Sequence, residues 1–171
     1  MNEEDAELVL RGGHACVTTL PSRPRNRQNG GYIPAMKSRS PSRKLPASGP
    51  LPKPESPREA REVLKAEAFP APHVQLVTMT GTEFTSICPK TGQPDFGTVI
   101  IEYVPKDLCI ESKALKYYLW SYRNEGAFCE ALAAQIADDV VYAIKPKSLT
   151  VRVTQNVRGG IALVAEASRE G

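Results

Sequence analysis

One stretch of the chain combines a thiol, a carboxylate and a turn. Cys88 is followed seven residues later by Asp95, and three of the six residues between them are proline or glycine. That composition predicts a tight, exposed connection rather than a buried segment. Lys90 and the free amides of such a loop would lower the pKa of the thiol, and the thiolate is the nucleophilic form of cysteine. The stretch therefore predicts a nucleophilic cysteine beside a carboxylate.

The other cysteines bear on the compartment and on metal binding. Cys16, Cys88, Cys109 and Cys129 show neither CxxC pairs nor the density of a disulfide framework, which favours free thiols in a reducing, cytoplasmic setting. Cys88, Cys109 and Cys129 are about twenty residues apart with only His73 nearby, so we expect no metal site. The acidic start of the chain does not resemble a signal peptide, and no apolar run approaches the roughly 18 residues of a membrane span.

Charge divides the chain into unlike parts. Residues 8–54 carry nine Lys or Arg and no Asp or Glu, whereas residues 73–171 carry ten basic and eleven acidic side chains. The first segment is rich in Pro, Ser and Gly and buries too little apolar surface to offset its ordering entropy. We expect a disordered basic leader at 1–54, a short helix and linker at 55–72 that opens on a capping box at Ser56, and a folded domain at 73–171.

Apolar periodicity predicts four strands and two helices in the folded domain. Strands are expected at 74–79, 96–104, 148–155 and 161–165. One helix buries the residues that recur at helical spacing, namely Leu115, Tyr118, Leu119 and Tyr122. A second helix begins near Gly126 and ends before Pro146, with apolar residues every four positions. The order ββααββ is an α+β pattern, with a four-stranded antiparallel sheet and two helices on one face.

The free edges of this sheet predict self-association. Unpaired strand edges need to be covered or paired, and joining several copies edge to edge into a β-barrel achieves this. We therefore expect a homo-oligomer.

Several separated motifs resemble one enzyme family. The run Glu83-Phe-Thr-Ser-Ile-Cys-Pro-Lys-Thr-Gly-Gln-Pro-Asp-Phe96 resembles the catalytic loop of the 7-cyano-7-deazaguanine reductases, the NADPH-dependent nitrile reductases of queuosine biosynthesis. The run Glu111-Ser-Lys-Ala-Leu-Lys-Tyr-Tyr-Leu119 looks like the signature motif of that family. Phe128-Cys-Glu130 is similar to the substrate-binding tip of the family's second helix, and Arg158-Gly-Gly-Ile161 is similar to the turn between its last strands. The resemblance implies a tunnelling fold whose subunits, as a pentamer or decamer, form a β-barrel with active sites between neighbours.

The same resemblance implies the catalytic roles. Cys88 would add to the nitrile carbon to give a thioimide, which accepts hydride more readily than a nitrile does. Asp95 would protonate the nitrogen. Two NADPH molecules, used in turn, would then reduce the carbon to an aminomethyl group.

The resemblance also implies how the substrate is held. Glu130 would accept the two parallel donors of the deazaguanine, and the same pocket would be lined by Ile110, Glu111 and Ser112. The family commonly has histidine just before this glutamate, and here that position is Cys129. Cys129 would take that place in the substrate pocket, so any role of the histidine is absent, reassigned or met by a weak S–H donor. We expect Asp95 to be the sole side-chain acid.

A cationic helical face predicts that the protein binds NADPH, and this prediction does not depend on the resemblance. Lys113, Lys116 and Arg123 fall within about 80° of one another at roughly 100° per residue, apart from the buried stripe. Such a face suits the phosphates of NADPH, and Trp120 could stack on a flat ring. The sequence has no Gly-x-Gly-x-x-Gly run after a strand, so a Rossmann module is not indicated.

Other functions remain open from the sequence. An amidine-forming relative would use Cys88, Asp95 and Glu130 but let ammonia attack the thioimide. A non-catalytic paralogue would bind a purine-like ligand without a covalent adduct. A zinc-dependent hydrolase of the same fold lacks suitably spaced ligands. An RNA-binding protein with a basic arm is less favoured, because the expected substrate is a free base and no nucleic acid is needed.

Overall fold

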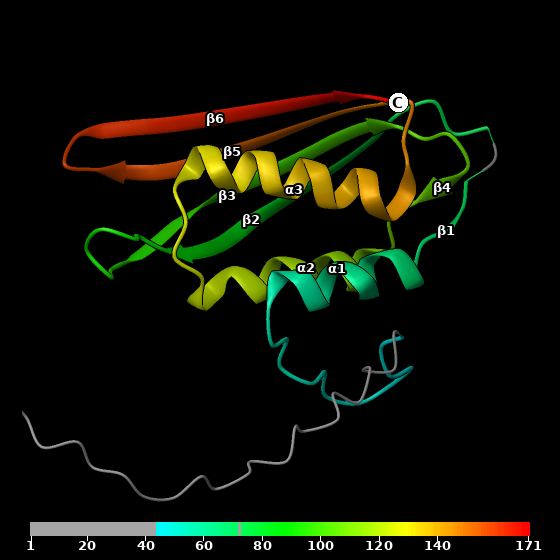
Figure 1. The fold of residues 1–171 in the computed structure, drawn as a ribbon, viewed down its shortest axis with the longest axis horizontal. Coiled ribbons are helices and arrows are strands. Elements are labelled where there is room, and N and C mark those ends of the chain that lie inside the picture. Colours follow the sequence, from blue (N-terminus) through cyan, green and yellow to red (C-terminus); the bar gives the residue numbers. More distant parts are fainter. Residues whose placement is uncertain (1–43, 72) are drawn as a thin grey trace, which may run out of the picture. The chain divides into compact units, whose positions relative to one another are not determined.

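The computed structural model describes residues 44–71 and 73–171. Figure 1 shows the helices, which are α1 (Pro57–Ala66), α2 (Ser112–Trp120), the 3-10 turn η1 (Ser121–Asn124) and α3 (Cys129–Ile144). The strands are β1 (Phe69–Pro70), β2 (Val77–Ile87), β3 (Pro94–Val104), β4 (Leu108–Cys109), β5 (Ser148–Arg158) and β6 (Ile161–Glu170). Most of the predicted leader, residues 1–43, lies outside the described residues.

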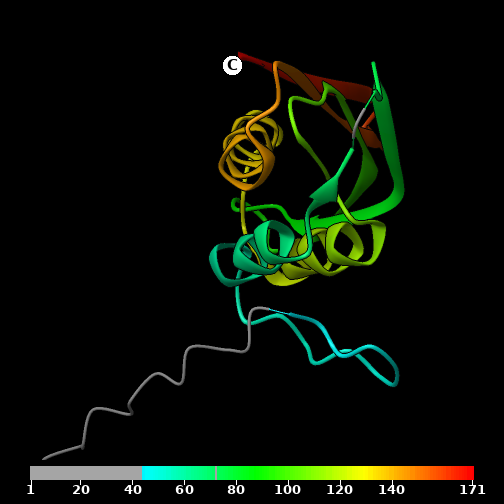
Figure 2. The same ribbon diagram turned by 90° about the vertical axis from the view of Figure 1, so that its right-hand side faces the viewer.

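The four long strands form one antiparallel sheet. Their order is β2-β3-β5-β6, and the short strands β1 and β4 pair separately. Helix α2 contacts β2, α3 contacts β5 and β6, and α1 contacts both other helices. Figure 2 shows this helical layer on one face of the curved sheet. The structure therefore confirms an α+β fold with an antiparallel sheet and the helix predicted after Ser56, and it adds η1 and the β1–β4 pair to the predicted elements.

Strand β2 differs most from its prediction. The expected strand at 74–79 begins at Val77 and continues to Ile87, directly before Cys88. The pairing of β2 with β3 shifts register between Gly81 and Phe84, which marks a bulge. Polar residues from Thr80 to Glu83 hid this half of the strand in the sequence, because a strand at a sheet edge needs few apolar side chains.

Helix α3 and the last hairpin also differ from their predicted bounds. Helix α3 begins at Cys129 rather than near Gly126, because Gly126 forms a parallel bridge with Ile87. Strands β5 and β6 run to Arg158 and Glu170, past the predicted ends at 155 and 165. The outer parts of these strands alternate less clearly because both faces are largely exposed.

Helix α1 is part of the domain core. Ser56 accepts a hydrogen bond from the N–H of Glu59, as the capping box predicts, and Ala60 and Leu64 are fully buried. Residues 44–54 contain no helix or strand, yet Leu45 is buried and its N–H donates to Glu67 Oε1 at 2.8 Å. Packed structure therefore starts before residue 55.

A buried polar network joins the three helices. Asp139 in α3 accepts hydrogen bonds from Tyr118 Oη at 2.8 Å and Arg61 Nη1 at 3.2 Å, and Tyr118 Oη lies 2.7 Å from Tyr122 Oη. Burial raises the pKa of Asp139, although its partners oppose that shift. The network fixes η1, the turn that leads toward the Cys88 end of the sheet. Across residues 44–71 and 73–171, no helix combines the length and apolarity of a membrane span.

Candidate active site

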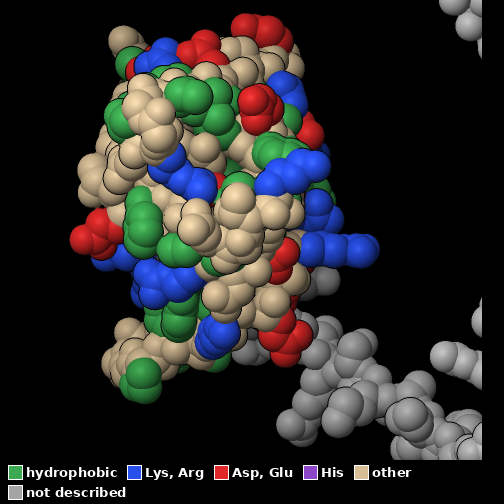
Figure 3. Space-filling model, turned by 90° about the vertical axis from the view of Figure 1, so that its left-hand side faces the viewer, with side chains coloured by type: hydrophobic (Ala, Val, Ile, Leu, Met, Phe, Trp, Pro, Cys, Tyr) green, Lys and Arg blue, Asp and Glu red, His purple; other side chains and the backbone are tan. Residues whose placement is uncertain are grey.

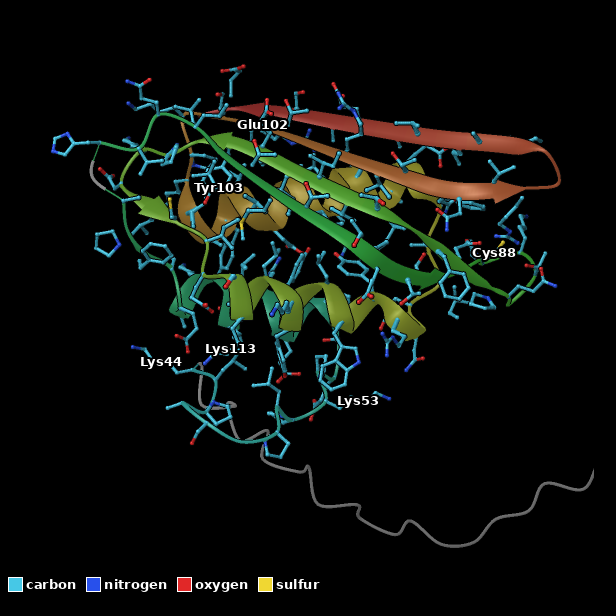
Figure 4. All side chains as sticks on the ribbon, turned by 180° about the vertical axis from the view of Figure 1, so that it is seen from behind. Lys44, Lys53, Cys88, Glu102, Tyr103 and Lys113 are labelled. Atoms are coloured by element: carbon cyan, nitrogen blue, oxygen red, sulfur yellow. The ribbon has the colours of Figure 1, made fainter. Side chains whose placement is uncertain are left out.

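Cys88 lies on a closed loop between β2 and β3. Its N–H donates to the carbonyl oxygen of Gln93 at 2.8 Å, and its own carbonyl accepts from Gly92 N–H at 2.9 Å. Gly92 has φ of +68°, a left-handed conformation that glycine adopts without strain. The thiol is partly exposed at one end of the sheet (Figure 4). The structure thus confirms the predicted turn around the thiol.

The loop lowers the pKa of the Cys88 thiol to about 7. The largest cause is a hydrogen bond with the Thr91 side chain, followed by the backbone N–H groups of Lys90 and Thr91, and then Arg158. The sequence predicted the effect of the amides, but it assigned a role to the charge of Lys90 instead of its backbone. About half of the thiol is ionised at neutral pH, which suits a nucleophile.

Asp95 lies opposite Ser86, near the start of β3, and is only 4% exposed. Its carboxylate forms an ion pair with Arg158, and Gln155 Nε2 donates to Oδ2 at 3.4 Å. Gln155 comes close to Asp95 because its pairing partner on β3 is Gly97. Any side chain at position 97 would collide with the carbonyl oxygen of Thr154. A guanidinium in this position stabilises negative charge on the carboxylate.

Arg158 is the residue that the sequence analysis missed. It ends β5, pairs with Asp95, donates from Nη2 to Gln93 Oε1 at 3.4 Å, and contributes to the lowered pKa of Cys88. One side chain therefore joins the thiol loop to the buried carboxylate. Its position beside Gly159 and Gly160 at a hairpin turn was the available signal, but that signal indicates only a turn.

Glu130 lies at the same end of the molecule as Cys88. The N–H of Ile87 donates to Glu125 O at 2.9 Å, and Ala127 N–H donates to Ile87 O at 3.2 Å. These bonds hold the segment before α3 against the strand that precedes Cys88. Glu130 is exposed in the first turn of α3, so its carboxylate is available to a ligand.

The Cys129 thiol points away from this surface. It is 1% exposed and its Sγ donates to Val153 O at 3.4 Å, inside the layer between α3 and β5. Burial raises the pKa of this thiol. The structure therefore gives Cys129 a packing role and does not bring its side chain to the predicted substrate pocket.

The remaining predicted pocket residues lie at the other end of α2. Glu111 caps the helix, accepting from Lys113 N–H at 2.9 Å and Ala114 N–H at 2.8 Å. Ile110 is buried, and its N–H donates to Tyr103 Oη at 2.9 Å. Figure 4 shows Cys88 and Lys113 at opposite ends of the domain. Within one chain, Ile110, Glu111 and Ser112 are not brought to the thiol.

The residues predicted to bind the cofactor do not all line the same pocket. Lys116, Trp120 and Arg123 line a pocket of about 440 Å³ against β2, and Arg123 Nε donates to Thr85 Oγ1 at 3.4 Å. A second pocket of about 280 Å³ also includes Lys116 and extends to Ser112. Lys113 lines neither pocket, and its Nζ donates to the carbonyl oxygen of Pro46 at 3.2 Å.

Exposed apolar side chains surround the Cys88 end. Figure 3 views this end and shows hydrophobic patches interspersed with Lys and Arg. Large exposed apolar residues from its segments are Phe96, Phe128, Val157 and Ile161. Such a concentration is typical of a contact surface.

Comparisons with known proteins agree with these features. A family model described as "QueF-like protein" matches residues 94–171. The chain is 49% identical to the NADPH-dependent 7-cyano-7-deazaguanine reductase of Syntrophus aciditrophicus over 64% of this chain and 81% of the relative. It is 56% identical to the protein of the same name from Nitrosococcus oceani, over 46% of this chain and 61% of that one.

A solved structure is also similar. The archaeosine synthase QueF-Like, in its apo form, matches with a TM-score of 0.55 and 26% identity. The match covers 57% of this chain and 96% of that chain.

Proposed function

The chain belongs to the family of NADPH-dependent 7-cyano-7-deazaguanine reductases, and we propose that it reduces the nitrile of 7-cyano-7-deazaguanine to an aminomethyl group for queuosine biosynthesis. The observation that carries the proposal is the Cys88 thiol, whose pKa is lowered to about 7 at a sheet end that also holds Asp95 and Glu130. A thiolate beside a carboxylate suits covalent addition to an electrophilic carbon.

Addition of the thiol balances without an external reagent. The electron pair of the Cys88 sulfur forms the S–C bond, a π pair of the nitrile moves to nitrogen, and nitrogen takes a proton. Because the attacking thiolate has already released its proton to solvent, the proton that Asp95 would pass to nitrogen is replaced from solvent. Arg158 contacts both groups, which places them within reach of one guanidinium.

Glu130 is the proposed recognition group for the substrate. A carboxylate accepts two parallel N–H donors with charge assistance, as a deazaguanine ring N–H and its exocyclic amine present them. Among residues 44–71 and 73–171, no side chain or backbone group donates a hydrogen bond to the Glu130 carboxylate, whereas Glu111 caps α2. Recognition of the substrate through Glu130 does not require the Cys129 thiol, which donates a hydrogen bond inside the core.

The residues beside β2 fit a phosphorylated nucleotide. Lys116 and Arg123 supply two positive charges, and Trp120 supplies a flat ring in the same pocket. NADPH supplies hydride when bound. Lys113 would join this set only by leaving the carbonyl oxygen of Pro46.

The proposed active site is shared between copies of the chain. Ile110, Glu111 and Ser112 are remote from Cys88 within one chain, so a neighbouring copy would supply them. Strands β2 and β6 are the edges of the sheet, and apolar side chains are exposed at the Cys88 end. Edge-to-edge assembly into a β-barrel would pair the edges and complete the site. The resemblance implies five or ten copies.

Intact mass spectrometry tests the covalent step. The full chain is mixed with 7-cyano-7-deazaguanine, and a mass increase equal to that of the ligand is expected. The increase should be absent in Cys88→Ala. Failure of the wild-type chain to form the adduct would overturn the proposal.

The identity of the second reactant, NADPH or ammonia, distinguishes a reductase activity from an amidine-forming activity. We expect NADPH oxidation that depends on the nitrile, and no amidine product when ammonia is added without NADPH. Amidine formation without NADPH oxidation would favour the activity named for the solved structural neighbour.

A further inference from the structure

A carboxylate lies among the cationic residues beside β2. Glu83 is exposed, and it lines the pocket of about 440 Å³ together with Lys116, Trp120 and Arg123. Across residues 44–71 and 73–171, Glu83 forms an ion pair with neither of the two cations. Arg123 instead donates from Nε to Thr85 Oγ1 at 3.4 Å. The pocket therefore combines two positive charges with an acceptor that neither of them occupies.

The bulge in β2 gives Glu83 this position. The register of β2 against β3 shifts between Gly81 and Phe84, so two residues, Thr82 and Glu83, lie opposite one residue of β3. Before the shift Met79 and Gly81 are the less exposed residues, and after it Phe84 is buried. Without the bulge, alternation would turn Glu83 toward the helices in the place that Phe84 takes. The bulge therefore leaves the Glu83 side chain exposed while it still lines the pocket.

A carboxylate in this pocket repels the phosphates of a nucleotide but suits its sugar. Like charges repel, so the phosphates are expected on Lys116 and Arg123 rather than on Glu83. The hydroxyls of a ribose are donors, and acidic side chains accept from them in other dinucleotide sites. In NADPH the adenosine ribose carries a phosphate, which leaves the nicotinamide ribose with two adjacent free hydroxyls. One carboxylate can accept from both of these hydroxyls.

We propose that Glu83 is a further binding residue for the cofactor, whose carboxylate accepts hydrogen bonds from the two hydroxyls of the nicotinamide ribose. The inference rests on the proposed function for the identity of the nucleotide. It adds a direction to that proposal, because the carboxylate lies on β2 while the cations Lys116 and Arg123 lie on α2 and η1. The ribose of the nicotinamide is therefore placed against the strand, and the phosphates against the helices.

The fluorescence of one residue reports on this pocket. Trp120 is the only tryptophan of the chain, and it lines the same pocket as Glu83. A reduced nicotinamide absorbs where tryptophan emits, so titration with NADPH in the absence of the nitrile gives a dissociation constant from the loss of emission. Reduced nicotinamide mononucleotide, which carries the ribose in question, is titrated in the same way. The adenosine bisphosphate half of NADPH lacks that ribose and is measured by competition, from the emission that it restores.

Glu83→Gln removes the charge and one of the two acceptors. The amide has nearly the same size, and the side chain is exposed, so the change does not open the core. The dissociation constants of NADPH and of reduced nicotinamide mononucleotide should rise at least about tenfold. That of the adenosine bisphosphate should stay within about twofold or fall. Glu102→Gln, an exposed carboxylate on β3 outside this pocket, is the matched control and should bind all three ligands as the wild-type chain does.

The sign of the change decides the inference. If Glu83 were only a surface charge, its removal would strengthen the binding of every phosphate-bearing ligand. Unchanged or tighter binding of NADPH in Glu83→Gln therefore overturns the inference and leaves the proposed function intact. Equal weakening of all three ligands also overturns it, because the adenosine half cannot contact Glu83 through the missing ribose. If NADPH does not change the emission of Trp120 in the wild-type chain, the inference and the proposed cofactor pocket both fail.

Discussion

The guanidinium of Arg158 pairs with the carboxylate of Asp95, joining the end of β5 to the start of β3. The carboxylate is buried, while the Arg158 side chain is 40% exposed. Because the same guanidinium also contacts the Cys88 thiol, the charge state of one group affects the other. Nucleophile and acid are therefore coupled through a residue from a different hairpin.

Replacing Arg158 should affect both stability and thiol chemistry. Arg158→Ala leaves the Asp95 carboxylate buried without its partner, so the free energy of unfolding should fall by at least about 1 kcal/mol in urea titrations. The pH midpoint of Cys88 alkylation by iodoacetamide, followed by peptide mass, should rise, because Arg158 contributes to the lowered pKa of this thiol. Arg152→Ala, on the same strand and in an exposed ion pair with Glu166, is the matched control. Equal stability and equal midpoints in the two variants would contradict the coupling.

Adduct formation should increase with pH through neutrality. The thiolate is the reactive form, and the pKa of Cys88 is lowered to about 7. The single-turnover rate should therefore be low at about pH 5, half-maximal near 7 and constant above about pH 8. Rapid mixing with the nitrile followed by acid quench and mass analysis measures this rate. A midpoint near the ordinary value for cysteine would show that the loop does not activate the thiol.

Glu130→Gln should weaken substrate binding. The amide can accept only one of the two parallel donors and lacks the charge, so KM for the nitrile should rise at least about tenfold while kcat changes less than about threefold. Steady-state kinetics with saturating NADPH gives both values. Glu170→Gln, at an exposed position near the end of β6, should match the wild-type chain. A large fall in kcat with unchanged KM would assign Glu130 to the chemical step.

Mixed oligomers should recover activity if the site is shared. Cys88→Ala and Glu111→Ala chains should each be inactive, but co-expression should restore about a quarter of the sites, where a neighbour supplies what one chain lacks. Turnover of the co-purified mixture measures the recovery. A mixture of Cys88→Ala with Asp95→Asn is the control, because both changes lie on the same side and no site regains both residues. Recovery in both mixtures, or in neither, would argue against a site between copies.

The local features of the site could be predicted from the sequence. Proline and glycine around Cys88 specify a turn, the spacing of Leu115, Tyr118 and Tyr122 specifies a helical face, and Ser56 specifies a helix start. Each of these depends on residues within a few positions of one another. The bounds of β2 were missed because its second half carries polar residues at a sheet edge.

The sequence by itself determined the thiol, the loop that exposes it and the α+β pattern around it, since short-range sterics and periodicity are written in consecutive residues. Only the tertiary structure decided that Arg158 reaches Asp95, that Cys129 turns into the core, and that Lys113 lies far from Cys88. These relations follow from the register of β5 against β3 and from the length of α2. A pairing register is set by the packing of whole strands, and no local pattern encodes it.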